Sequence, residues 1–252
     1  MIGLLGKKIG MTQIFGTNGE QIPVTVLEVG PCSVVQIKTK EKDGYQAVQL
    51  AFAPKKSART TQPELGHFKA HHVEPKKFVR EIRTETLAGL EEGKEIGVNN
   101  FSVGDYVDVI GTSIGHGFQG VVKRHKCKGG GRTHGSMFGR VPGSIGSSSF
   151  PSRVFKGLRL PGHMGHARST VQNLRVEKID LEHHLMAVRG AVPGAENGYL
   201  TIREAVKKRR SRKWRLPEEG IEELKLEEKK APTAPPKKAV PAKKKPVAEK
   251  KK

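Results

Sequence analysis

From Val109 to Val176 the chain runs for sixty-eight residues without a single aspartate or glutamate. The same stretch carries eleven lysine and arginine, five histidine and fourteen glycine residues. A stretch of this composition can bury too little apolar surface to offset the entropy of ordering, which costs on the order of 1 kcal/mol or more per residue. We therefore expect it to order against a polyanion that neutralises its charge, and nucleic acid is the natural partner of this kind.

The net charge of +21 is concentrated in two segments of the 252-residue chain. The acid-free stretch contributes +11, and the segment from Lys207 to Lys252, with eighteen basic and seven acidic residues, contributes a further +11. All other residues together contribute −1. The C-terminal segment ends in low-complexity sequence rich in Lys, Ala and Pro, which predicts a disordered tail. The chain thus combines two cationic modules with a nearly neutral body.

The body contains short runs of β-branched and apolar residues, separated by residues that favour turns. These runs are Ile22–Val29, Ser33–Lys38, Tyr45–Phe52, Phe78–Arg83, Tyr106–Ile110, Val171–Ile179, Leu185–Arg189 and Tyr199–Arg203. Several alternate with a period of two, and Lys42–Tyr45 is typical of a tight hairpin turn between two of them. No segment of the body has a sustained helical periodicity. The pattern predicts a mainly β protein built around a small antiparallel barrel.

Strand patterns stop at Ile110 and resume in the same style at Val171, so the acid-free stretch is predicted to be one long, irregular excursion from a single barrel. The barrel body would comprise residues 1–111 and 171–206, with a side lobe at about 53–76, followed by the tail, residues 207–252. The excursion, residues 112–170, could reach at most ~100 Å outward, at ~3.3 Å per residue along each arm.

Cysteine usage and motif content argue against several classes of protein. Cys32 and Cys127 provide neither a disulfide framework nor a CxxC zinc motif, which is typical of a reducing cytoplasm. The N-terminal segment lacks the features of a signal peptide, and no apolar run is long enough to cross a bilayer. No serine or cysteine has an evident catalytic base, and there is no phosphate-binding loop. These features predict a cytoplasmic protein with no enzymatic activity, cofactor, small-molecule substrate or membrane partner.

Gly115, Gly117 and Gly120 fit the GxGxxG pattern of dinucleotide-binding folds and follow the expected strand Tyr106–Ile110. A nicotinamide site also needs a crossover helix and an acidic residue about twenty positions later to bind the ribose. The next acidic residue here is Glu177. The missing acid argues against an oxidoreductase, and the glycines are better suited to a tight turn or to close approach of the backbone to phosphates.

Basic and histidine side chains are the expected binding residues of the excursion. Lysine and arginine neutralise phosphates, and arginine also stacks on exposed bases. The histidines match no zinc-ligand spacing and have no carboxylate nearby, so we expect contact with RNA and no metal site. The residues concerned are Lys123, Arg124, His125, Lys126, Lys128, Arg132, His134, Arg140, Arg153, Lys156, Arg159, His163, His166 and Arg168. Ser147, Ser148 and Ser149 are expected at a flexible apex.

Two motifs are notable, the N-terminal Gly6-Lys-Lys-Ile-Gly10-Met-Thr12-Gln-Ile-Phe15 and the stretch Gly111-Thr-Ser113-Ile-Gly115-His-Gly117-Phe-Gln-Gly120-Val-Val-Lys-Arg124. They resemble the N-terminus and the signature of the L-three family of large-subunit ribosomal proteins. Further matches are Thr133-His-Gly135-Ser, Arg140-Val-Pro-Gly-Ser-Ile-Gly146, Val154-Phe-Lys-Gly157, Leu160-Pro-Gly-His-Met-Gly165 and Gly190-Ala-Val-Pro-Gly194. They occur in one order from residue 1 to about 206, and a start without a transit extension is typical of bacterial members.

The resemblance implies a closed, six-stranded, Greek-key-like antiparallel barrel with an extension that reaches into large-subunit rRNA towards the peptidyl-transferase centre. It implies a primary binder near the 3′ end of that rRNA that nucleates subunit assembly, next to the fourteenth and nineteenth large-subunit proteins. It adds Lys7, Lys8 and the apex serines to the expected RNA contacts. Ser149 stands where many bacterial members carry a methylated glutamine, so we expect no such modification here.

The main alternative from another class is a nucleoid-type DNA-binding protein. The Lys-Ala-Pro composition of the tail favours it, because linker-histone-like tails are built from lysine and alanine. The central module, in contrast, is rich in Gly, Arg and His and is inserted within the barrel, as expected for a segment that threads through irregular RNA.

Overall fold

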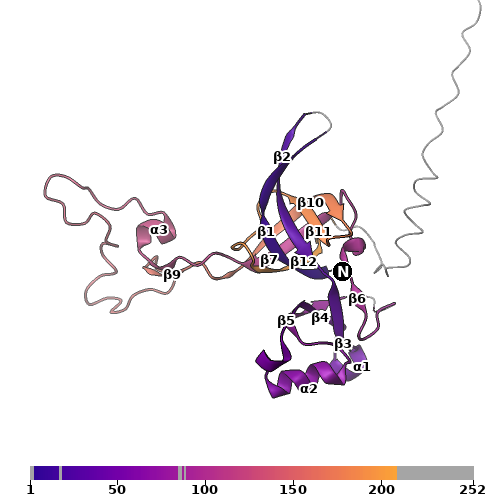
Figure 1. Ribbon diagram of the computed structural model, residues 1–252. Coiled ribbons are helices and arrows are strands. Elements are labelled where there is room, and N and C mark those ends of the chain that lie inside the picture. Colours follow the sequence, from indigo (N-terminus) through magenta and orange to yellow (C-terminus); the bar gives the residue numbers. More distant parts are fainter. Residues whose placement is uncertain (1–2, 17–18, 85–86, 88, 209–252) are drawn as a thin grey trace, which may run out of the picture.

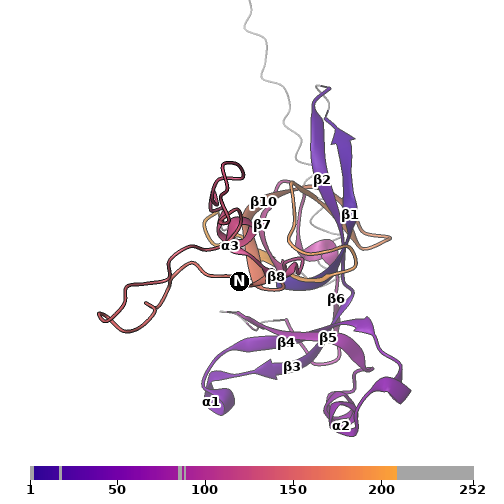
Figure 2. The ribbon, with the colours of Figure 1, turned by 90° about the vertical axis from the view of Figure 1, so that its left-hand side faces the viewer.

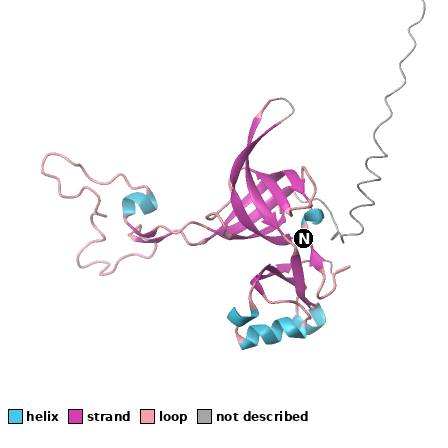
Figure 3. Cartoon of the chain, in the orientation of Figure 1, coloured by secondary structure: helices cyan, strands magenta, loops and turns pink. Residues whose placement is uncertain are grey.

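The computed structural model describes residues 3–16, 19–84, 87 and 89–208. These residues form a β-barrel, a side lobe and a long extension (Figure 1). Strands make up most of the barrel, whereas loops make up most of the extension (Figure 3). The predicted tail, residues 207–252, lies outside the described residues except for Lys207 and Lys208.

Six antiparallel strands close the barrel. In order around it they are β1 (Gly3–Phe15), β12 (Tyr199–Glu204), β7 (Tyr106–Thr112), β10 (Arg168–Asp180), β11 (Leu185–Arg189) and β2 (Gln21–Val29), which returns to β1. The prediction of a mainly β fold with a closed six-stranded antiparallel barrel is confirmed. Alternation along β12 buries Leu200 and Ile202 in the core and leaves Tyr199 and Thr201 half-buried, because successive side chains of a strand point to opposite faces.

The strand patterns in the sequence missed β1, the N-terminal strand. Its glycines lower strand propensity, yet the packing requires two of them. A Cβ at Gly6 would lie 2.6 Å from the carbonyl oxygen of Glu28 in β2, and a Cβ at Gly3 would lie 2.9 Å from Ile82 Cδ1. The close approach of β1 to β2 and to the side chain of Ile82 therefore explains why a barrel strand contains these glycines.

A second sheet forms the core of the side lobe, residues 32–96. Its strand order is β5 (Lys76–Arg83), β4 (Ala47–Pro54), β3 (Cys32–Lys38) and β6 (Glu95–Ile96). The prediction that the runs at 33–38, 45–52 and 78–83 belong to the barrel is wrong, and the side lobe is larger than the expected 53–76. Alternation in a sequence predicts a strand but not the sheet in which that strand finds its partners.

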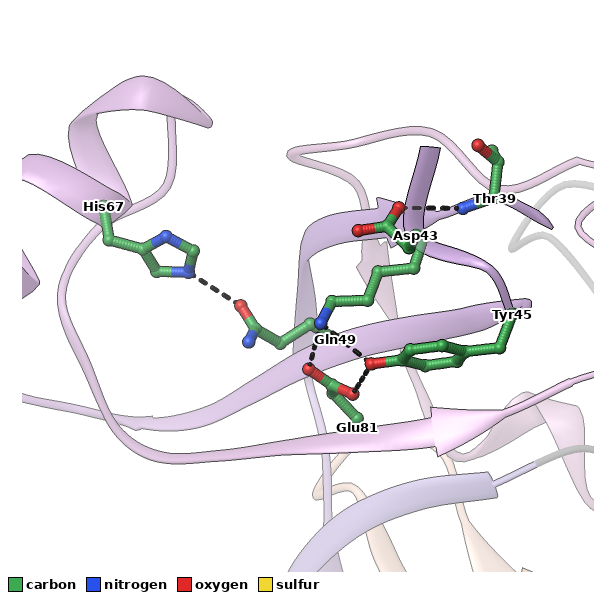
Figure 4. Close-up of polar contacts among 7 residues, drawn as sticks. Thr39, Asp43, Tyr45, Gln49, His67 and Glu81 are labelled. Atoms are coloured by element: carbon green, nitrogen blue, oxygen red, sulfur yellow. Dashed lines mark hydrogen bonds and ion pairs between the residues drawn. The ribbon is translucent and has the colours of Figure 1, made fainter. Parts of the chain in front are cut away.

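Short helices cover the side lobe. They are α1 (Lys40–Asp43), the 3-10 turn η1 (Ser57–Arg59) and α2 (Gln62–Ala70), and a second 3-10 turn, η2 (Val98–Asn100), follows the lobe. Phe68 is the buried residue of α2 and packs with Val35 and Ala51, so the helix has no apolar stripe that periodicity could detect. His67 also contacts Gln49 of β4, with Nε2 and Oε1 2.7 Å apart (Figure 4).

The turn predicted at Lys42–Tyr45 is the end of α1. Gly44 adopts the left-handed conformation, with φ of 79°, and its N–H donates to the carbonyl of Lys40. The connection between β3 and β4 is therefore one helical turn closed by a glycine, and not a two-residue hairpin turn.

The side lobe and the barrel share one hydrophobic core. Leu4 and Leu5 of β1 belong to the same buried cluster as Val48 and Leu50 of β4. Beside this core, the rings of Phe78 and Tyr199 stack with centroids 4.9 Å apart and planes 11° apart. No helix among the described residues is long and apolar enough to span a membrane.

Two projections leave the barrel in different directions (Figures 1 and 2). One is the hairpin arm, the outer parts of β1 and β2. The other is the extension, residues 113–167, which contains β8 (Gly117–Gln119), α3 (Val121–His125) and β9 (Gly162–Met164). The predicted excursion thus has regular structure in its inner part and an irregular outer part.

Candidate nucleic-acid interface

The extension begins as a continuation of two barrel strands. Thr112 of β7 lies opposite Arg168 of β10 at its root. Beyond the barrel, Ser113 N donates to Ala167 O at 2.9 Å and His116 N donates to Met164 O at 2.9 Å. These bonds lead into the β8–β9 pair, so the two arms of the extension leave the barrel as a hydrogen-bonded ribbon.

Gly165 permits the close contact between these arms. Its φ is +77°, which side chains rarely adopt, and a Cβ there would lie 2.1 Å from the carbonyl oxygen of Ile114. A backbone oxygen held in a ribbon cannot move aside as a flexible side chain can. The glycine is therefore a geometric requirement of the root.

The loop after β11 supports the root from the barrel side. Lys8 Nζ donates to Val192 O at 2.9 Å and to Gly194 O at 3.1 Å. Gly194 has φ of +96°, and a Cβ there would lie 2.8 Å from Thr112 O. Two donors of Lys8, which the resemblance implied as an RNA contact, are thus engaged with protein carbonyls.

Arg124 and His125 of α3 connect the two arms. Arg124 Nη1 donates to Leu160 O at 2.7 Å, and His125 Nε2 lies 3.2 Å from the same oxygen. Gly162 makes room for the guanidinium, since a Cβ there would lie 2.6 Å from Arg124 Nη1. Both side chains therefore position the extension, whatever else they contact.

The GxGxxG glycines lie on this ribbon and at the start of α3. The described sheets are antiparallel, whereas a dinucleotide site needs a parallel strand–helix–strand crossover. The helix that follows has only five residues. The glycines serve the turn and strand geometry of the ribbon, as the missing acid had indicated.

The outer part of the extension consists of loops whose backbones pass closely. Gly130 N donates to the carbonyls of Phe138 and Gly139, both at 3.2 Å. A Cβ at Gly130 would lie 2.5 Å from Phe138 O, and one at Gly129 would lie 2.5 Å from Gly139 O. These glycines allow loops to fold on one another without a side-chain core.

Nearly all the predicted contacts of the extension and its root face solvent. The exposed ones are Lys123, Arg124, Lys126, Lys128, Arg132, His134, Arg140, Ser147, Ser148, Ser149, Arg153, Lys156, Arg159, His163, His166 and Arg168. His125 is half-buried. In the described part of the chain, no ion pair involves a cation of residues 113–168. The extension therefore presents unneutralised positive charge along its length.

Exposed apolar side chains are the feature that sequence reasoning missed. Ten of the sixteen large apolar side chains exposed among the described residues lie in the extension: Ile114, Phe118, Met137, Phe138, Val141, Ile145, Phe150, Val154, Phe155 and Leu158. Phe150 is 85% exposed, and Arg153 Cζ lies 5.5 Å from the ring centroid of Phe155. Phenylalanines interleaved with arginines are a signal for base stacking that the sequence already contained.

Among the residues that the structure describes, no group of three or more His, Cys, Asp or Glu side chains is placed to hold a metal ion. The expected histidines are spread along both arms of the extension.

Comparison with known proteins identifies the family. The large ribosomal subunit protein uL3 of Pelotomaculum thermopropionicum is 53% identical over 207 residues, which cover 82% of this chain and 98% of the relative. The chain belongs to the ribosomal protein L3 family. The uL3 proteins of Geotalea daltonii, 51% identical over 205 residues (81% of this chain, 97% of the relative), and Brachyspira pilosicoli, 45% identical over 213 residues (84% and 98%), are similar too. A sequence model of the family Ribosomal protein L3 matches residues 84–184, which include the whole extension.

Membership of the L3 family confirms the resemblance drawn from the motifs. The protein is a structural, non-enzymatic component of the large ribosomal subunit, located on cytoplasmic ribosomes. The matches to the L3 relatives leave part of this chain without a counterpart.

Proposed function

We propose that the protein binds large-subunit rRNA directly through the extension, near the 3′ end of that rRNA, and nucleates assembly of the subunit. The observation that carries this proposal is the exposed, unpaired positive charge from Lys123 to Arg168. Charge of this density without carboxylate partners repels itself and is stabilised by phosphates, whose counterions are released on binding.

RNA fits the extension better than duplex DNA does. Readers of the DNA major groove insert a helix or a two-stranded ribbon, but the outer loops of the extension contain neither. Irregular RNA offers unstacked bases for Phe118, Phe138 and Phe155, and phosphates for the cations beside them. A competition experiment between large-subunit rRNA and duplex DNA for the full chain distinguishes this proposal from a nucleoid function. The proposal requires a preference for rRNA, whereas a nucleoid function requires that duplex DNA bind equally well.

The apex of the extension is proposed to lie near the peptidyl-transferase centre. Ser147, Ser148, Ser149 and Phe150 are exposed and uncharged, and cations stand on either side of them. Arms that bind phosphates and a tip without charge suit a segment that passes through a crowded interior. Nucleotide footprinting of ribosomes that carry Ser149→Arg should show changes near the catalytic centre, and changes confined to the outer surface of the rRNA contradict this placement.

Neighbouring large-subunit proteins, the fourteenth and nineteenth, are proposed as protein partners. The hairpin arm is the surface that suits a protein best, because Ile9, Met11 and Phe15 are exposed there and no lysine or arginine lies between Ile9 and Gln21. Cross-linking from Met11→Cys in assembled subunits tests this, and cross-links to rRNA alone contradict it.

The central experiment deletes the extension. Because Ser113 and Ala167 are hydrogen-bonded neighbours, residues 114–166 can be replaced by a short glycine linker at the root. The deletion should leave a folded barrel, seen by circular dichroism, that no longer enters large subunits. Truncation after Val206 is the matched control and should preserve incorporation, with weaker salt dependence of binding to arbitrary RNA. Normal incorporation of the deleted protein contradicts the proposal.

A further inference from the structure

Where the side lobe meets the barrel, two cationic side chains contact a pair of stacked aromatic rings. Lys77 Nζ is 5.7 Å from the ring centroid of Tyr199, and the Tyr199 ring stacks on Phe78. On Phe78, Arg80 Cζ lies 4.8 Å from the ring centroid. Lys7 of β1 is directly opposite Tyr199 in the barrel ladder. These five residues are here called the junction cluster.

The cations of the junction cluster remain available to a ligand. Lys77 and Arg80 are exposed, whereas Phe78 and Tyr199 are half-buried. Arg80 Nη1 donates to Val79 O at 2.9 Å, which fixes the guanidinium over the ring and leaves its other donors free for outside acceptors. A ring face holds a cation by its quadrupole and uses none of its N–H groups.

Local carboxylates do not neutralise these cations. Within the described part of the side lobe, the ion pairs are Lys38–Glu81, Lys55–Glu64, His71–Glu92 and Lys94–Glu91. None of them includes Lys77 or Arg80, and Glu81, the carboxylate that β5 carries beside Arg80, pairs with Lys38. Glu28 is opposite Lys7 on the β2 side but does not form an ion pair with it. The junction cluster is therefore a positively charged surface region at the edge of a lobe whose other charges are largely balanced.

The junction cluster also lies beside the root of the extension. Tyr199 precedes Leu200, which pairs with Gly111, and Thr112 follows as the root residue. β5, which carries Lys77 and Arg80, is the edge strand of the side lobe on the side towards which the extension projects (Figure 1). Its eight residues extend over roughly 26 Å, and Lys76 and Arg83 add charge at both ends.

We propose that the junction cluster is a second binding site for the phosphate backbone of large-subunit rRNA. This inference rests on the proposed function, since it extends the RNA-binding surface from the extension onto the side lobe. Lys7, Lys77 and Arg80 contact phosphates there, and the Phe78–Tyr199 pair positions the two side-lobe cations. The cluster binds RNA at the foot of the extension and thereby fixes the direction in which the extension leaves the barrel.

Salt dependence of binding tests the charge contacts. The probe is large-subunit rRNA purified from Geotalea daltonii, with the full chain and the extension-deleted chain as proteins. The double variant Lys77→Gln, Arg80→Gln should lower the slope of log affinity against log salt by roughly two, about one for each lost phosphate contact. The control Lys40→Gln, Lys42→Gln removes the same charge from α1 of the same lobe, where both lysines are exposed, and should leave the slope unchanged.

The extension-deleted chain separates this inference from the proposed function. It should keep a weak, salt-dependent affinity, to which the tail also contributes, and the Lys77→Gln, Arg80→Gln pair should lower its salt slope by the same amount as in the full chain. Equal slopes for the junction and control variants overturn the junction site while leaving the proposed function intact. If the unmodified full chain shows no preference for rRNA, the proposed function itself fails.

Tethered probing locates the contact in assembled subunits. An iron chelate on Glu74→Cys, an exposed position just before β5, should cleave rRNA, with Cys127 replaced by serine and Cys32 buried out of reach. The same tether on Glu41→Cys in α1 is the control and should cleave rRNA less. Cleavage of a neighbouring protein at Glu74→Cys without rRNA cleavage shows that the cluster faces protein, and overturns the inference.

Discussion

Asp108 of β7 accepts a hydrogen bond from the backbone N–H of Asn173 in β10, with Oδ1 3.0 Å from the nitrogen. Its other oxygen, Oδ2, accepts from Val206 N at 3.3 Å and lies 3.6 Å from Arg203 Nη2. The β7–β10 register shifts between Val171 and Leu174, and the carboxylate supplies the acceptor that the ladder loses there. The buried carboxylate of Asp108 thus connects β7 and β10, the two strands that carry the extension, to the end of β12.

Replacing Asp108 by asparagine should destabilise the barrel by about 2 kcal/mol, because an amide cannot accept at both positions and one buried backbone N–H loses its acceptor. Urea unfolding of the full chain at neutral pH measures this change. Glu182→Gln removes the same charge from an exposed turn and should change the free energy of unfolding little. Equal stability of the two variants contradicts the structural role given to Asp108.

Variants at Asn173 should differ in stability in an unusual order. It is left-handed, with φ of 57°, and its side-chain Oδ1 is buried without a hydrogen-bond partner. Asn173→Gly removes both costs and should be as stable as the native chain or more so. Asn173→Ala should lose about 1 kcal/mol, because asparagine tolerates the left-handed conformation better than alanine does. Chemical denaturation of both variants checks this order, and a glycine variant less stable than the alanine variant would show that the side chain contributes a contact.

Much of the barrel could be predicted from the sequence, because β-branched alternation reports the burial of each strand. The assignment of β3, β4 and β5 to a second sheet could not be predicted, since partner choice depends on contacts between residues distant in sequence. α2 went unnoticed because it buries little besides Phe68.

The solvent exposure of the proposed binding residues was easier to predict than their contacts within the protein. Absence of acidic residues indicated the extension, and solvent exposure of its cations follows from their charge. Lys8, Arg124 and His125 could not be recognised as internal supports, because the carbonyls that they contact carry no residue-type signal. Of the junction cluster, Lys7 was expected as an RNA contact, whereas Lys77 and Arg80 were not, because the lobe that contains their strand carries acidic residues as well as basic ones.

Gly165→Ala tests the root of the extension. The added Cβ would meet Ile114 O while the backbone stays left-handed, so the two arms must separate. The barrel should unfold at an unchanged temperature, whereas affinity for large-subunit rRNA should fall by about tenfold or more, since left-handed strain alone costs on the order of 1 kcal/mol. Gly139→Ala, where a Cβ meets nothing within 4 Å, is the control in a filter-binding assay. An affinity equal to that of the control would show that the root tolerates separation.

Acid should weaken the side lobe through Glu81. Its carboxylate lies 2.8 Å from Lys38 Nζ and accepts a hydrogen bond from Tyr45 Oη at 2.9 Å (Figure 4), and the Lys38 contact in particular holds the pKa of Glu81 below its ordinary value of 4.5. A pKa lowered by folding adds stability above the unfolded value and loses it as the pH falls through the folded value. Glu81→Gln should therefore be less stable than the native chain at pH 7, by under about 1 kcal/mol because the pair is partly exposed. The difference should disappear as the pH falls through the lowered pKa of Glu81. A difference that persists in acid contradicts this origin.

Amide exchange of the free protein should divide the extension into two parts. Backbone bonds of the ribbon, such as Ser113 N to Ala167 O, should give moderate protection near the root. The apex from Val141 to Phe155 is largely exposed. Of its backbone amides, only that of Gly146 donates a hydrogen bond, to Ser144 Oγ at 3.4 Å, so the amides of the apex should exchange fast. Barrel strands should exchange slowest, because their bonds break only with the shared core.

Binding of large-subunit rRNA should slow amide exchange most at the apex, where the amides of the free protein are least protected. Bound phosphates and stacked bases supply the partners that the loops lack, and ordering is driven by that contact. The tail-truncated chain is the control and should show the same gain in protection. Strong protection of Val141–Phe155 without RNA would mean that the loops are ordered by their own contacts, and that the entropy argument from composition is wrong.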